Sequence, residues 1–150
     1  MNTRALLISA GIAGVLAGVL SGLPIVSAVN CLLCGWVWGA GILAVYLYRR
    51  NTGAAPVTTS TGLIIGLLVG IISAILASLL STAFTANTPV PLTQEQLEQL
   101  GDAAEFLTNP AAMGATTFLV NLIAHPIFGA IGGLIGSAIF KNRATPGTMG

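Results

Sequence analysis

The sequence predicts an all-α integral membrane protein, a four-helix bundle with one amphipathic surface helix between the third and fourth spans. Two features of the composition indicate this class: 55% of the 150 residues are hydrophobic and only 6% are charged, whereas about 25% of the residues of soluble domains are charged. The third observation is that the few charges flank long apolar stretches. Crossing the hydrocarbon core takes about 20 apolar residues in a helix, and these stretches are that long.

Three charge-free stretches hold the four predicted spans. Residues 5–48 are enough for two spans and a turn, and residues 51–94 and 106–140 hold one span each. We expect residues 1–150 to form a single membrane domain. The predicted spans are residues 5–23, 31–48, 62–84 and 112–140.

The sign of the charges predicts the orientation of these spans. With four crossings, every basic residue falls on one side of the membrane and every acidic residue on the other. Because basic residues concentrate in cytoplasmic segments, we expect a multi-pass protein of the cell inner (plasma) membrane, with cytoplasmic N- and C-termini and an acidic loop outside. The basic residues are Arg4, Arg49, Arg50, Lys141 and Arg143, and the acidic residues are Glu95, Glu98, Asp102 and Glu105.

A short outer turn separates the first two predicted spans. Pro24 interrupts the first helix, residues 24–30 form the turn, and Asn30 is placed to cap the second helix. Aromatic residues at both ends of the second span are typical anchors at a membrane interface. They are Trp36 and Trp38 at the outer end, and Tyr46 and Tyr48 beside the cytoplasmic arginines.

The third predicted span is flanked by a loop before it and a surface helix after it. Residues 51–61 are rich in Thr, Gly, Ala and Pro, which indicates a flexible loop. Residues 94–107 form the predicted amphipathic helix, with Thr93 and Gln96 as its capping box. Its apolar residues recur at helical spacing, and its acids precede them by two residues, about 200° of rotation, so they face water. The apolar residues are Leu97, Leu100, Ala104 and Leu107.

The fourth predicted helix begins at a capping sequence and contains a proline. Asn109 precedes Pro110, which is favoured at the first helical position. The helix runs to Phe140, and its roughly 30 residues would reach about 45 Å, longer than the hydrocarbon core. We expect it to tilt, to kink at Pro126, or to leave its first turns outside the membrane.

Small residues four apart occur in every predicted span. In lipid, helices associate through close backbone approach, which small residues permit. The glycines therefore have two interpretations: internal packing of a compact monomer, or additional association with a second copy or another membrane protein. The predicted packing glycines, among 19 in the chain, are Gly14, Gly18, Gly22, Gly35, Gly39, Gly62, Gly66, Gly70, Gly129, Gly132, Gly133 and Gly136.

Cys31 and Cys34 form a C-x-x-C pair at the first turn of the second predicted span. Residues three apart share a helix face, a helix N-terminus favours thiolate chemistry, and the predicted outer location allows oxidation. The pair is a candidate redox site. The alternatives are a structural disulfide or two buried free thiols, since cysteine is often simply a small apolar residue.

Four spans, cytoplasmic termini and Cys31-Leu-Leu-Cys34 resemble the quinone-coupled disulfide oxidase family of bacterial envelopes. The resemblance implies that Cys31 and Cys34 are the first redox pair of that family. The second outer-loop pair of the family has no counterpart, because the chain has only two cysteines. The basic residue that follows the family's first pair is also missing, since Gly35 and Trp36 come next. These departures interrupt the family's electron relay.

A second resemblance covers most of the chain. Asn30-Cys31-x-x-Cys34-x-Trp36, residues 41–48 and the glycine pattern of residues 129–136 resemble small uncharacterised prokaryotic membrane proteins. The resemblance implies a four-helix membrane fold and carries no activity with it.

His125 is the only histidine of the chain and the only ionisable residue well inside a predicted span. Asn121 lies one turn before it on the same face, so the two form a possible intramembrane polar site. The interpretations are a neutral histidine bonded to Asn121, to a backbone carbonyl or to a Ser or Thr of a neighbouring helix, a proton relay, or an axial ligand of haem or chlorophyll. We expect no metal site, because two thiols and one distant histidine do not form a tetrahedral set.

These patterns favour a protein without enzymatic activity that acts by glycine-mediated helix packing, as a homo-oligomer or an accessory subunit of a membrane complex. Its expected partners are lipid and itself or another membrane protein. The alternatives are a thiol–disulfide or quinone-linked redox protein using Cys31 and Cys34, and a channel or small-solute carrier. The net charge of +1 excludes an electrostatic nucleic-acid binder.

Overall fold

The computed structural model describes residues 2–23, 35–53, 55–87, 93–101, 103 and 108–141. In these ranges all regular structure is helical, which confirms the all-α prediction. The helices are α1 (Thr3–Gly22), α3 (Gly35–Asn51), α4 (Thr59–Asn87), α5 (Gln94–Leu100) and α7 (Pro110–Lys141).

α1 begins two residues before its predicted start because Asn2 caps it. The Asn2 Oδ1 atom accepts a hydrogen bond of 3.1 Å from the Ala5 amide, which satisfies one of the amides that a helix start leaves without a partner. The helix ends at Gly22. The expected turn at residues 24–30 lies outside the described residues.

α3 continues three residues past Tyr48, its predicted end, through both arginines. The Thr52 hydroxyl donates to the Tyr48 carbonyl at 2.9 Å, and Gly53 follows with φ +69°, a left-handed conformation in which glycine commonly ends a helix. Residues 31–34, predicted to start this helix, lie outside the described residues.

α4 is six residues longer than predicted, and α5 is shorter. α4 starts at Thr59 because the Thr58 hydroxyl caps it, accepting from the Thr61 amide at 3.2 Å. The predicted loop at 51–61 is correspondingly shortened by the ends of α3 and α4.

α5 starts at the predicted capping box. The Gln96 amide donates to the Thr93 hydroxyl at 3.3 Å, and the Thr93 amide donates to Gln96 Oε1 at 3.0 Å. The described helix stops at Leu100 because Gly101 adopts φ +50°. The helix predicted over 94–107 therefore extends beyond the end of α5. Ala104, Leu107, Asp102 and Glu105 lie outside the described residues.

α7 runs unbroken for 32 residues, with Pro126 inside it. Asn109 caps its start, since Asn109 Oδ1 accepts from the Ala111 and Ala112 amides at 3.0 and 3.2 Å. Pro110 stands at the first helical position, where its missing N–H costs nothing.

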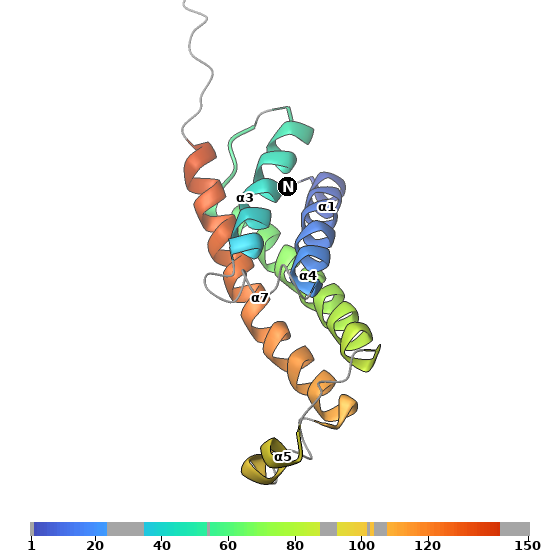
Figure 1. Cartoon of the computed structure of the whole chain (residues 1–150). Helices are drawn as coiled ribbons and strands as arrows, with labels where there is room; N and C mark the ends of the chain where they lie inside the picture. The colour runs from blue at the N-terminus through green and yellow to red at the C-terminus, as the bar shows by residue number, and fades with distance from the viewer. Residues whose placement is uncertain are drawn as a thin grey trace, which may run out of the picture.

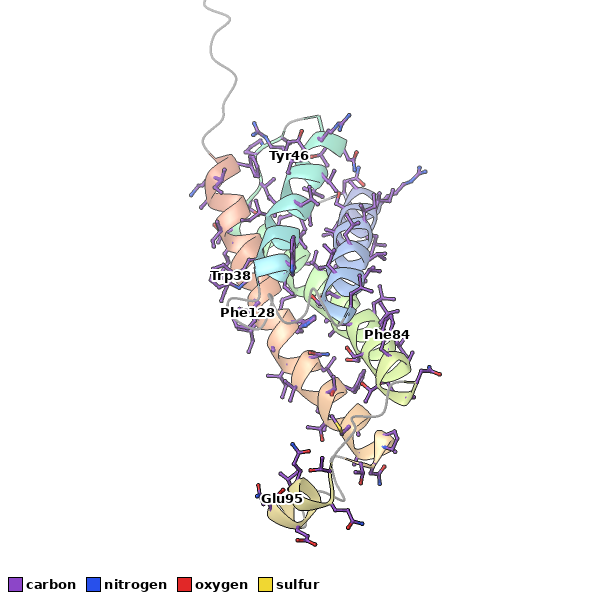
Figure 2. The ribbon with its side chains drawn as sticks, viewed as in Figure 1. Trp38, Tyr46, Phe84, Glu95 and Phe128 are labelled. Atoms are coloured by element: carbon purple, nitrogen blue, oxygen red, sulfur yellow. The ribbon has the colours of Figure 1, made fainter. Side chains whose placement is uncertain are left out.

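α4 and α7 form a long pair, and α1 and α3 pack against one half of it (Figure 1). α5 lies beyond the far ends of α4 and α7 in Figure 1. The core is made mostly of small side chains, while many large apolar side chains point outward over the helix surfaces (Figure 2). Leu79 is 64% exposed and Ile123 65% exposed. Such a surface is suited to lipid, because the bilayer core is as apolar as leucine.

Three described helices are long and apolar enough to cross a membrane: α1, α4 and α7. α3 has 17 described residues and is not among them, so the predicted count of four spans is not confirmed. The membrane character of the chain is confirmed.

Candidate functional site

The glycines of α4 and α7 bring the two backbones into direct contact. A Cβ added to Gly66 would collide with the Gly129 carbonyl, and one added to Gly129 would collide with the Gly66 carbonyl. Gly62 meets Gly133 in the same way, and a Cβ on Gly62 would also lie 2.6 Å from the Ser137 Cβ. No methyl group fits between these turns.

The three predicted packing glycines of α1 face α4. A Cβ on Gly14, Gly18 or Gly22 would lie 2.6–2.8 Å from the Cβ of a larger α4 residue. Those α4 residues are Ile72, Leu76 and Leu80, in that order. Because the residue numbers of the α1 glycines and of their α4 contacts both increase in steps of four, α1 and α4 run in the same direction. They keep one register along three turns.

α3 contacts α7 through a glycine that the four-residue spacing did not single out. A Cβ on Gly41 would lie 2.8 Å from the Gly129 carbonyl and 2.8 Å from the Gly133 amide. From the other side, Gly132 meets the Trp38 backbone and Gly136 meets Val45. α7 therefore presents one glycine face to α4 and another to α3.

Gly35 and Gly39 differ from the other predicted packing glycines. Both are exposed, and a Cβ at either position would meet no atom within 4 Å. Within the described part of the chain, no neighbouring helix packs on them.

His125 is buried between α7 and α4, and its Nδ1 atom lies 2.9 Å from the Ser73 hydroxyl. Ser73 also donates to the Gly70 carbonyl at 3.0 Å. A serine has a single hydroxyl hydrogen, so when Ser73 gives it to the Gly70 carbonyl, it accepts from an Nδ1–H of His125. This tautomer leaves a lone pair on Nε2.

Asn121, one turn before His125 on α7, also bonds to α4: its Nδ2 atom donates to the Ser78 hydroxyl at 3.1 Å. One turn further, Thr117 lines a cavity of about 20 Å³ together with Ser81, Thr82 and Thr85 of α4. That volume is enough for about one water molecule. We call these residues the polar row: Thr117, Asn121 and His125 on α7, with Ser73, Ser78 and Ser81 on α4.

Residues 7–144 match the family model of the MJ1491 transmembrane domain. The chain belongs to the MJ1491 transmembrane domain family. The match takes in nearly all of α1 and the whole of α3, α4, α5 and α7. No curated protein and no solved structure matches the chain.

Other predicted sites of this MJ1491-domain protein are not brought together among the described residues. Cys31 and Cys34 lie outside them, so the C-x-x-C pair stays a prediction. In the described part of the chain, no three His, Cys, Asp or Glu side chains are close enough to hold a metal ion.

The polar end of the MJ1491 domain opposite α5 carries an open cavity of about 600 Å³. The Tyr48 hydroxyl lines it and accepts from the Asn2 amide at 3.2 Å. Arg49 lies over the Phe140 ring, 5.9 Å from its centroid, which is typical of a cation–π contact. Tyr46 is labelled at this end in Figure 2, and Glu95 of α5 at the other.

Proposed function

We propose that the chain crosses the membrane four times and acts by helix association, as a homo-oligomer or an accessory subunit of a membrane complex. Membership of a transmembrane domain family supports the membrane setting. The internal glycine contacts of α1, α3, α4 and α7 support a compact unit that holds its own shape.

The distribution of charge supports cytoplasmic termini and an outer acidic loop. Arg4 lies in the first turn of α1, Arg49 and Arg50 lie in the last turn of α3, and Lys141 ends α7. α1 and α3 meet at this end through the Asn2–Tyr48 hydrogen bond, whereas Glu95 lies at the opposite end (Figure 2). A basic end and an acidic end are the arrangement expected of a protein with positive residues inside.

The observation that carries the association proposal is the open face at Gly35 and Gly39. Glycine within a helix costs about 1 kcal/mol relative to alanine, and at twelve other positions a Cβ would meet a neighbouring helix in this chain. At Gly35 and Gly39 it would meet no described atom within 4 Å. Two small residues four apart on a lipid-facing surface permit close approach of another helix.

Disulfide cross-linking in lipid tests this proposal. Cys31 and Cys34 are replaced by serine, and Gly39→Cys is introduced. The variant protein is then reconstituted in vesicles and oxidised. Ile12→Cys is the matched control, since Ile12 is 49% exposed on the outward face of α1. We expect a cross-linked dimer for Gly39→Cys and none for Ile12→Cys.

An accessory subunit gives a different result. Gly39→Cys then forms no dimer, and a second membrane protein co-purifies in mild detergent at fixed stoichiometry and is lost from Gly39→Leu. A monodisperse monomer without either result refutes the association function.

A further inference from the structure

We propose that His125 is a proton-binding site within the membrane, open to the end of the molecule that carries α5 and closed toward the other end. This goes beyond the association function, and it rests on the contrast between the two halves of the α4–α7 interface.

The depth of His125 follows from its neighbours. Ser73, its hydrogen-bond partner, packs against α1 at Gly18, where a Cβ would lie 3.2 Å from the Ser73 Cα. Gly18 is one turn, about 6 Å, from the end of α1 at Gly22. The imidazole therefore lies inside the apolar layer that α1 spans, in the half nearer α5.

Toward α5, the interface is polar at each turn. The Asn121–Ser78 hydrogen bond comes first, and the cavity lined by Thr117 and Ser81 comes next. Gly22 contacts Leu80, so α4 passes the end of α1 at this cavity. A water molecule held there is within about two helical turns of His125, and the side chains between are hydrogen-bonding groups.

Toward the other end, the interface is closed. A Cβ on Gly70 would collide with the His125 carbonyl, and the contacts of Gly66 with Gly129 and of Gly62 with Gly133 are backbone to backbone. A site that excludes a methyl group excludes water, whose share of liquid volume is about 30 Å³. Along the described α4–α7 interface, protons therefore reach the ring from one side.

The proton forms an N–H bond at Nε2 and is delivered by water at the α5 end, while Nδ1–H stays bonded to Ser73. The Asn121 side-chain carbonyl lies one turn away on the same helix face, and we expect it to accept from the new N–H. α4, which packs against the ring, has no ionisable residue. The charged residues of α1, α3 and α7 are Arg4, Arg49, Arg50 and Lys141, all at the closed end, while Glu95 and Glu98 of α5 lie at the open end.

Nuclear magnetic resonance of the protein in lipid nanodiscs tests this directly. Because the chain has one histidine, ¹⁵N-histidine labelling reports His125 alone. At high pH we expect the Nδ1–H tautomer, and between pH 9 and 4 we expect conversion to the doubly protonated ring. A ring that stays neutral across this range overturns the proposal.

Matched variants test the route. Thr117→Val and Asn121→Leu remove hydrogen-bonding groups on the open side, and we expect each to slow hydrogen–deuterium exchange at the ring at least tenfold. Ser137→Ala is the control at the closed end, where the hydroxyl bonds only to the Leu134 carbonyl of its own helix; we expect exchange to be unchanged. If Thr117→Val, which keeps the side-chain shape, and Asn121→Leu both leave the exchange rate at the wild-type value, the one-sided route is wrong.

Discussion

Gly66 of α4 and Gly129 of α7 meet backbone against backbone, each occupying the space where the other would carry a Cβ. The contact sets the separation of the two longest helices. It also brings Cα–H groups and carbonyl oxygens of the two helices together, a weak attraction that recurs at helix–helix interfaces. The stability of the α4–α7 pair therefore depends on the absence of side chains at these two positions.

Gly66→Ala should destabilise the protein by about 1–3 kcal/mol, because the added methyl group forces the helices apart. Gly11→Ala is the control: a Cβ there meets nothing within 4 Å, and the better helix propensity of alanine should raise the free energy of unfolding by up to about 1 kcal/mol. Denaturant unfolding in detergent micelles measures both. Equal free energies of unfolding for the two variants would show that the α4–α7 contact is looser than described.

Ser73→Ala should lower the free energy of unfolding by about 0.6 kcal/mol, the average for hydrogen bonds between membrane helices, and by no more than about 1.7 kcal/mol, the largest value found for such bonds. The loss arises because the Nδ1–H of His125 then has no acceptor. The ¹⁵N shifts of the ring should change at the same time. Ser137→Ala removes a bond within α7 alone and should leave those shifts unaltered.

Trp38→Phe should be tolerated with a change below about 1 kcal/mol. The Trp38 Nε1 atom is buried and has no hydrogen-bond partner among the described residues, and such a group costs about 1–3 kcal/mol. Removing this buried N–H group offsets the loss of buried apolar area in the ring contact with Phe128, whose centroid lies 6.0 Å from that of Trp38 (Figure 2). Trp38→Ala, which also deletes the contact, should cost about 3–5 kcal/mol. Thermal unfolding of both variants in one detergent makes the comparison.

Reporter fusions test the orientation. Fusions after Lys141 and after Asn51 should both report the cytoplasm, and a fusion after Asn87 should report the outside, because the basic residues gather at one end of the helices. Opposite locations for the fusions after Asn51 and Lys141 would require an odd number of crossings between them.

The helices could be predicted from the sequence because charge-free runs specify spans directly. α1 and α7 start within two residues of their predicted positions. α4 extends further because its first turn, Thr-Ser-Thr, is polar, and hydropathy gives no sign of a helix that begins at a hydroxyl cap.

The packing face of α3 could not be predicted from spacing alone. Gly35 and Gly39 follow the four-residue rule, yet Gly41 contacts α7. Positions two apart lie about 200° apart around a helix, so Gly39 and Gly41 occupy opposite faces. Which of these faces packs depends on where α7 lies, and that position is not encoded in the α3 segment.

A Ser or Thr of a neighbouring helix is among the expected partners of His125, and Ser73 of α4 is that partner, but which residues bond to His125 and Asn121 could not be predicted for a similar reason. Ser73 and Ser78 are small residues of the glycine-rich α4 and look like packing residues. Only the antiparallel register of α4 and α7 places their hydroxyls beside the ring and the amide.

α1 packs against α4, although α3 lies between them in the sequence. This order has a consequence for biogenesis. Gly22 meets Leu80, so the glycine groove of α1 has no permanent occupant until most of α4 has left the ribosome. At synthesis rates of about 5–20 residues per second, that interval lasts several seconds. During this interval the glycine groove of the newly inserted α1 is exposed in the bilayer, where lipid chains or the insertion machinery can contact it.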